Sequence, residues 1–273
     1  MCRLVGYLGE PILLESILVK PVNSLVMQSL HARESSVPTN GDGFGVGWYA
    51  PELSPNPGLF VSIFPAWSDR NLIHLTAKIK SQCFFAHVRA ASVGGTNSYN
   101  CHPFSYDKWM LMHNGDIHQF SRIKRHLRHL LDDTIYNSIQ GETDSEHFFA
   151  LFLQLSQGQD FTNLTKIADI FEQTLRTVER LSQQYTDATN PSYFNVCITD
   201  GKRLLASRYC SDKNTAPESL HYLDNGNFND SLNIKGVVIA SEELTDVSNR
   251  WQTIPANHLI LVDEDLSITF RGL

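Results

Sequence analysis

Residues 193–209, YFNVCITDGKRLLASRY, contain two apolar runs separated by Asp200 and Gly201. An Asp-Gly pair between two such runs is a strong short-range signal for a β-hairpin, in which the strands pair antiparallel. Four more runs typical of strands follow the hairpin, namely SLHYLD (219–224), IKGVVIAS (234–241), NHLILVDED (257–265) and SITFRG (267–272). The last third of the chain therefore predicts an antiparallel sheet.

The segment before this sheet has helical periodicity. Thr143 and Glu146 have the spacing of a capping box, and the run of apolar residues after them predicts a buried helix that begins at Thr143. A second helix is expected at about 163–184, with its apolar residues on one face, and basic and apolar residues alternate at helical spacing over 117–131. The middle of the chain is thus predicted to be helical.

The N-terminal part returns to strands. They are expected at CRLVGYLG (2–9), which Gly9, Glu10 and Pro11 should close, and at FGVGWYA (44–50), CFFAHVRA (83–90) and WMLMHNG (109–115). Short helices are expected at 24–33 and 69–80, and PELSPNPG (51–58) is expected to be a surface loop. Strands, helices and strands in this order, without βαβ alternation, predict an α+β fold of antiparallel sheets sandwiched by helices. We expect a single domain over residues 1–273.

Composition excludes several classes of protein. The 273 residues are 42% hydrophobic, which is enough for a sizeable core, and the net charge of −7 disfavours nucleic acid as a partner. No run of about 20 apolar residues predicts a membrane span. The five cysteines are odd in number and form no CxxC pair. This pattern of cysteines, together with the lack of a recognisable signal peptide, predicts free thiols in a reducing compartment, the cytoplasm.

Cys2 is the first candidate catalytic residue. If Met1 is removed, Cys2 carries a thiol and a free α-amine on the same carbon. Unperturbed, these groups have pKa values of about 8.5 and about 7.7–8.0, so the amine can accept the proton of the thiol. The alternative is an incidental cysteine at position 2.

Three further candidates lie at the ends of predicted elements. Asn114 and Gly115 follow a strand and could donate two hydrogen bonds to an oxyanion, although Asn-Gly is also a common turn. Arg89 could bind a carboxylate in bidentate fashion, or form a surface ion pair. Asp144 could bind a cation, or only compensate a helix dipole.

Taken together, Cys2 and a series of short motifs resemble a known family. The motifs are NGDGFGVGWY (40–49), FAHVRAAS (85–92), NCHPF (100–104), MHNGDI (112–117) and TDSE (143–146). They resemble the class II glutamine amidotransferases of the N-terminal-nucleophile hydrolase superfamily. The resemblance covers nearly the whole chain, and it is strongest to the branch that includes the amidotransferase-like subunit of the fungal glutathione-degradation complex and its bacterial relatives. It implies a four-layer αββα sandwich of two antiparallel sheets.

The resemblance also implies roles for individual residues. Cys2 would be the nucleophile and its α-amine the general base, while the Asn114 side chain and the Gly115 N–H would form the oxyanion hole. The substrate-binding residues would be Arg89 and Ser92 for the α-carboxylate and Asp144 for the α-ammonium. These roles suit a γ-glutamyl group, which presents a zwitterionic end to bind and an amide carbonyl to attack.

Departures from the family narrow the expected function. The loop NGDGFGVG (40–47) differs from the RGxDSAG-like loop of the phosphoribosyl- and hexosamine-forming members. Those members also carry an ammonia-consuming domain, which we do not expect in a chain of this length. We therefore expect hydrolysis of a γ-glutamyl amide, in a γ-glutamyl peptide such as glutathione or in glutamine, by a γ-glutamyl thioester. The resemblance also implies a peptidase-like protein partner. The alternatives are a glutaminase subunit that delivers ammonia to a separate synthase, or a catalytically silent scaffold that binds a partner.

No cofactor or metal is expected. GDGFGVG matches neither a Walker loop nor a GxGxxG turn before a helix. His126 and His129 have helical spacing, but their neighbours are cationic, which predicts a solvated basic helix face rather than a metal site.

Overall fold

Two antiparallel sheets form the centre of the computed structural model, which describes residues 2–35, 38–91, 94–161, 163–187, 189–229, 232–246 and 250–273. The seven-stranded sheet has the order β11-β9-β10-β1-β4-β2-β3 and the six-stranded sheet the order β13-β12-β8-β7-β6-β5. The strands of the first sheet are β1 (Arg3–Leu13), β2 (Phe44–Ala50), β3 (Ser54–Ser62), β4 (Lys80–Val88), β9 (His221–Asn229), β10 (Leu232–Ala240) and β11 (Gln252–Thr253). Those of the second are β5 (Phe104–Tyr106), β6 (Trp109–Asp116), β7 (Tyr193–Thr199), β8 (Leu204–Cys210), β12 (His258–Val262) and β13 (Ile268–Gly272).

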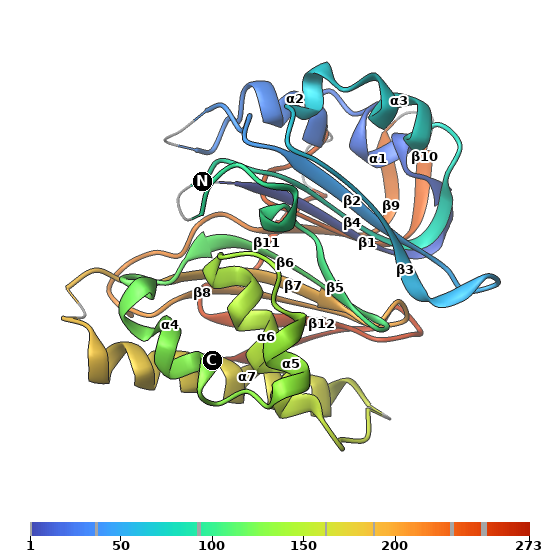
Figure 1. The fold of residues 1–273 in the computed structure, drawn as a ribbon. Helices are drawn as coiled ribbons and strands as arrows, with labels where there is room; N and C mark the ends of the chain where they lie inside the picture. Colours follow the sequence, from blue (N-terminus) through green and yellow to red (C-terminus); the bar gives the residue numbers. More distant parts are fainter. Residues whose placement is uncertain are drawn as a thin grey trace.

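Helices cover the outer face of each sheet (Figure 1). The seven-stranded sheet is covered by α1 (Glu15–Leu18), α2 (Leu25–Leu30) and α3 (Arg70–Thr76), with the 3₁₀ turn η1 (Ala66–Ser68) beside them. The six-stranded sheet is covered by α4 (Phe120–Arg128), α5 (Asp133–Ser138), α6 (Asp144–Ser156) and α7 (Leu164–Tyr185). A second 3₁₀ turn, η2 (Ser98–Asn100), precedes β5. The expected four-layer αββα sandwich is therefore confirmed.

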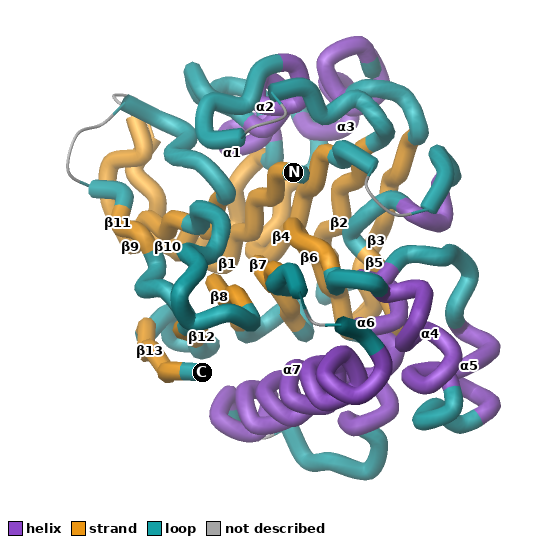
Figure 2. The backbone as a smooth tube through the Cα atoms, turned by 90° about the vertical axis from the view of Figure 1, so that its left-hand side faces the viewer, coloured by secondary structure: helices purple, strands orange, loops and turns teal. Residues whose placement is uncertain are grey.

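The alternation of side chains along the strands divides the core into three layers. Along β1, Leu4 and Leu8 face the six-stranded sheet, whereas Val5 and Tyr7 face the outer helices. The other sheet is buried in the same way, with its outer side chains packed against α4, α6 and α7. Figure 2 shows the strands between the two groups of helices. Every strand buried on both faces is apolar through most of its length, which is why these runs were recognisable in the sequence.

Two expected boundaries in the first sheet are wrong. β1 does not close at Gly9 but continues to Leu13, because its register with β4 shifts between Leu8 and Ile12 and pairing then resumes. The proline-rich segment expected to be a loop lies largely in β3, which begins at Ser54. β3 lies at one edge of its sheet and pairs with β2 alone. A proline, which has no backbone N–H, is tolerated there because no second strand needs that donor.

Other predicted features are confirmed or refined. The Asp-Gly hairpin joins β7 to β8, with Gly201 at a φ of +87°. At α6 the Thr143 Oγ1 accepts from the Glu146 N–H at 3.1 Å, but the Glu146 carboxylate accepts from the N–H groups of Gln140 and Gly141, both at 2.8 Å, rather than returning to Thr143. The expected capping box is therefore only half formed. Among the helices of the described residues, none is both long and apolar enough to cross a bilayer.

Candidate active site

Cys2 lies at the head of β1, which pairs with β10 on one side and β4 on the other. By strand alternation its side chain is on the same side as Leu4, toward the gap between the sheets. The half-buried Sγ accepts from the Ala90 N–H at 3.3 Å and donates to the Ala90 carbonyl at 3.4 Å. Burial raises the pKa of the Cys2 thiol, against the opposing effects of the Ala90 N–H and the Arg89 charge. A thiol in this environment needs a base to become a nucleophile.

Asn114 reaches the same gap from the opposite sheet. It shares the inner face of β6 with Met110 and Met112, and it is fully buried. Its Nδ2 donates to the Ser241 Oγ at 3.5 Å, and the same Oγ accepts from the Leu4 N–H at 3.0 Å. Ser241 therefore joins the Asn114 amide to the strand that carries Cys2. The Asn114 Oδ1 has no hydrogen-bond partner within the described part of the chain.

Gly115 occupies a position where no side chain fits. A Cβ there would lie 2.0 Å from the Tyr193 carbonyl oxygen and 2.6 Å from the His113 Nε2. The first of these atoms is backbone of β7, the paired strand, and cannot move away without breaking the sheet. Glycine is thus required beside Asn114 by packing alone.

Arg89 directly follows β4, and it is buried rather than part of a surface ion pair. Its Nη1 donates to the Gly95 carbonyl at 3.3 Å and its Nη2 to the Gly94 carbonyl at 3.2 Å. Asn100 Nδ2 donates to the same Gly95 carbonyl at 2.9 Å, and Asn100 Oδ1 accepts from the Glu142 N–H at 3.0 Å. Asn100 therefore connects the Arg89 loop to the segment that enters α6, a role that sequence reasoning missed.

Asp42, in the loop between α2 and β2, holds the backbone around Arg89. Its Oδ2 accepts from the Ala91 N–H at 2.9 Å, and its own N–H donates to the Arg89 carbonyl at 3.0 Å. The Arg89 N–H in turn donates to the Gly43 carbonyl at 2.8 Å. This loop departs from the family pattern, and here it positions the residues on both sides of Arg89. Sequence reasoning missed this role of Asp42.

Asp144 is the first residue of α6 and is buried at the helix N-terminus. Its Oδ2 accepts from the Ile117 N–H at 2.8 Å, just beyond the end of β6, and its Oδ1 accepts from the Ser145 N–H at 2.8 Å. Asp144 is therefore tied to the strand that carries Asn114, as well as to its own helix. Its role is more than compensation of the helix dipole.

The predicted residues thus lie at one end of the gap between the sheets. Arg89 is next to Cys2 through Ala90, Asn114 is joined to β1 through Ser241, and Asp144 contacts the end of β6. Ser92 lies outside the described residues.

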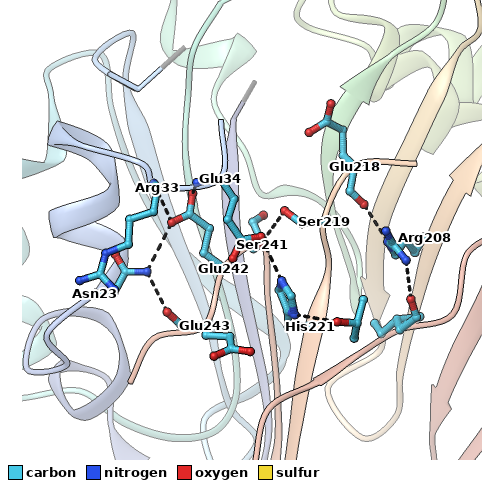
Figure 3. A network of polar contacts seen from close by, with 12 residues as sticks. Asn23, Arg33, Glu34, Arg208, Glu218, Ser219, His221, Ser241, Glu242 and Glu243 are labelled. Atoms are coloured by element: carbon cyan, nitrogen blue, oxygen red, sulfur yellow. Dashed lines mark hydrogen bonds and ion pairs between the residues drawn. The ribbon is translucent and has the colours of Figure 1, made fainter. Parts of the chain in front are cut away.

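A buried ion pair fixes Arg3, the residue after Cys2. Arg3 Nε lies 3.2 Å from Glu242 Oε1, and both side chains are essentially inaccessible to solvent. The Glu242 carboxylate also accepts from the N–H groups of Arg33 and Glu34, both at 2.9 Å. Figure 3 shows the Glu242 carboxylate beside Asn23, Arg33 and Glu34, with Ser241 next to it. Burial lowers the pKa of Arg3, and Glu242 opposes that effect. Sequence reasoning missed Glu242, because its partner Arg3 lies at the other end of the chain.

Two neutral imidazoles lie near Arg89. The rings of His87 and His102 are 4.2 Å apart, and burial lowers the pKa of His87 to about 3 and that of His102 well below its usual value. Neither ring therefore adds a positive charge at neutral pH. No cluster of three or more His, Cys, Asp or Glu side chains able to hold a metal occurs within the described residues. All five cysteines are free thiols, and the four other than Cys2 are buried.

This arrangement, with a thiol at the head of a central strand and amide donors on the facing sheet, defines an amidohydrolase-type enzyme with the fold of the N-terminal-nucleophile amidotransferases. The family model described as "Glutamine amidotransferases class-II" matches residues 16–271. The chain belongs to the class II glutamine amidotransferase family.

Individual relatives agree with this assignment. The chain is 36% identical to the "probable glutamine amidotransferase DUG3" of Saccharomyces cerevisiae, over 96% of this chain and 82% of that one. It is 29% identical to a γ-glutamyl-hercynylcysteine sulfoxide hydrolase of Mycolicibacterium smegmatis, with 95% of each chain covered. Among solved structures, a glutamine aminotransferase class-II domain protein from Silicibacter pomeroyi superposes with a TM-score of 0.70 at 25% identity, over 99% of both chains.

Proposed function

We propose that this enzyme hydrolyses a γ-glutamyl amide bond through a thioester on Cys2, in a single domain over residues 1–273. The observation that carries the proposal is the joint placement of Cys2 and Asn114. The thiol is held by the Ala90 backbone at the end of the gap between the sheets, and Ser241 joins the Asn114 amide to the same strand. A nucleophile and an oxyanion donor at one place are the two elements that acyl transfer needs.

The reaction follows from these groups. After removal of Met1, the α-amine of Cys2 takes the thiol proton and Sγ attacks the γ-carbonyl carbon. The Asn114 Nδ2 and the Gly115 N–H donate to the oxyanion that forms. Collapse of this intermediate breaks the C–N bond. The leaving amine takes up the proton that the α-amine had accepted from the thiol. Water then attacks the thioester, which releases glutamate and restores the thiol.

The glutamyl group would be recognised by charge at its zwitterionic end. Arg89 would bind the α-carboxylate in bidentate fashion, with Ser92 assisting, and Asp144 would bind the α-ammonium. The side chains of Arg89 and Asp144 are buried and held by hydrogen bonds to the backbone, so little conformational entropy is lost when the substrate binds.

We further propose a γ-glutamyl peptide such as glutathione as the preferred substrate, with a peptidase-like partner chain that completes the leaving-group side. The resemblance to the fungal glutathione-degradation subunit supports this choice. The name of the M. smegmatis relative also describes hydrolysis of a γ-glutamyl compound rather than of glutamine. The free thiols favour the cytoplasm as the place of the reaction.

The test compares kcat/KM for glutamine and for glutathione, with the chain alone and with a peptidase-like partner. Mass spectrometry first establishes that Cys2 is the N-terminal residue. Cys2→Ala should abolish hydrolysis, whereas Cys197→Ala, which removes a buried thiol of β7 that pairs with Met112 and has no role in the proposed reaction, should retain it. Full activity of Cys2→Ala would exclude the thioester. Efficient turnover of glutamine alone, with no γ-glutamyl peptide accepted under any condition, would instead favour an ammonia-supplying subunit.

A further inference from the structure

Two buried side chains that the proposed mechanism does not use lie behind Asp144. His113 precedes Asn114 on β6, but by strand alternation it faces the helices rather than the gap. Its Nε2 lies 2.9 Å from the Tyr193 carbonyl oxygen, and its Nδ1 lies 2.9 Å from the Ser145 Oγ. Because a carbonyl can only accept, the Nε2 carries a hydrogen. The imidazole therefore bridges β7 to the first turn of α6.

Ser145 continues this bridge to the carboxylate. It is the second residue of α6 and is buried, and its Oγ lies 3.2 Å from the Asp144 Oδ1. A hydroxyl has a single hydrogen, which Ser145 donates to Oδ1, so its Oγ accepts a hydrogen from the His113 Nδ1. Within the described residues, Asp144 also accepts from the backbone N–H groups of Ile117 and Ser145. The Ser145 hydroxyl thus connects the Asp144 carboxylate to the His113 side chain of β6.

His113 has little freedom to move. Its ring stacks on Phe194 with a centroid separation of 5.8 Å and an interplanar angle of 18°. The absence of a side chain at Gly115 leaves room for the ring, since a Cβ there would lie 2.6 Å from Nε2. Asp144 is therefore connected, through Ser145 and His113, to β6, the strand that also carries Asn114 and Gly115.

We propose that His113 and Ser145 are positioning residues that hold the Asp144 carboxylate for the α-ammonium group of a γ-glutamyl substrate. This inference rests on the proposed function. The terminal torsion of an aspartate is broad, and the backbone N–H groups of Ile117 and Ser145 each hold one oxygen of this carboxylate. The Ser145 hydroxyl adds a third hydrogen bond, on Oδ1, which narrows the remaining rotation and keeps the ammonium site at a set distance from the oxyanion donors. Binding of the ammonium group at this fixed site then places the γ-amide bond of the substrate next to Cys2 and the oxyanion donors.

The experiment uses two substrates that differ only in the α-amino group, γ-glutamyl-p-nitroanilide and glutaryl-p-nitroanilide. In Ser145→Ala we expect kcat/KM for the γ-glutamyl substrate to fall about tenfold, mainly through KM, because a hydrogen bond to a charged group is lost. Activity on the glutaryl substrate should change less than about twofold, since it has no ammonium group to place. Ser156→Ala is the matched control, because Ser156 is a buried serine of the same helix whose hydroxyl donates to the Phe152 carbonyl of its own helix.

The Asp144→Asn background separates positioning from a general loss of structure. There, Ser145→Ala should cause no further loss of preference for the amine-bearing substrate, because the carboxylate that it positions is absent. An equal loss on both substrates, or no loss on either, would overturn the assignment of Ser145 and His113. A wild-type enzyme that cleaves neither anilide nor any γ-glutamyl amide would refute the proposed function itself, which is a distinct outcome.

Discussion

Acidification from pH 7 to pH 5 should destabilise the folded protein through three buried histidines, His87, His102 and His147. Burial lowers the pKa of His87 to about 3 and that of His147 to about 4, and it lowers the pKa of His102 well below its usual value. In the unfolded chain each histidine titrates near pH 6.5. Between these values the unfolded chain binds protons that the folded protein does not. Stability is therefore full above about pH 6.5 and is lost as the pH falls toward the folded-state values.

The size of the effect follows from this linkage. Between pH 7 and pH 5, protonation of one such histidine in the unfolded chain raises the unfolding constant roughly 25-fold, or about 2 kcal/mol. His87 and His147 together amount to about 4 kcal/mol, which approaches the whole stability of many domains, and His102 acts in the same direction.

His102 offers the cleanest substitution. Neither of its ring nitrogens has a hydrogen-bond partner in the described part of the chain. His102→Leu replaces the imidazole with an apolar side chain of similar volume, so the free energy of unfolding at pH 7 should not fall by more than about 1.5 kcal/mol. The free energy of unfolding that this variant loses between pH 7 and pH 5 should be smaller than the loss in the wild type, because the imidazole whose pKa burial lowers is gone.

Urea unfolding at both pH values, followed by tryptophan fluorescence, measures the difference. His74→Leu is the control, because His74 is exposed on α3 and should leave the pH dependence unchanged. If His102→Leu and the wild type lose the same stability on acidification, the argument from the buried imidazole is wrong.

Three further predictions concern catalysis. An alanine inserted between Met1 and Cys2 should reduce hydrolysis nearly as much as Cys2→Ala, because it moves the free amine off the nucleophile, and normal activity of that variant would exclude the α-amine as the base. Asn114→Ala should lower kcat by roughly 10²- to 10³-fold with little change in KM, since its amide acts on charge that develops in the transition state; a steady-state effect on KM alone would limit Asn114 to ground-state binding. Arg89→Lys should raise KM roughly tenfold, because lysine keeps the charge but loses the two-pronged fit to a carboxylate, and unchanged binding of a γ-glutamyl substrate would remove Arg89 from the site.

Local patterns were enough to predict most of the fold. Buried strands such as β4 and β6 carry apolar runs that end in polar residues, and α6 and α7 have caps and periodicity that can be seen in a short window. β3 was missed because its prolines are compatible with a strand only at a sheet edge, and a local window does not reveal which strand lies at the edge.

The same limit applies to the candidate site. The proposed roles of Cys2 and Asn114 came from the order of motifs along the chain. The contributions of Asp42 and Glu242 could not be foreseen, because each acts on a segment far away in sequence. Asp42 holds the N–H of Ala91, and Glu242 pairs with Arg3 at the other end of the chain. Such contacts follow from the topology rather than from any local pattern.

The placement of β1 between β4 and β10 has a consequence for biosynthesis. Val5 pairs with both Ala86 and Ala240, so the ribosome must add about 235 residues before β1 gains its second neighbour. At about 5–20 residues per second this takes roughly 12–47 s. Throughout that interval β1 lacks its β10 neighbour. If Met1 is removed from the nascent chain within this time, it leaves an unfinished sheet, and the thiol and its neighbouring amine are enclosed only after both exist.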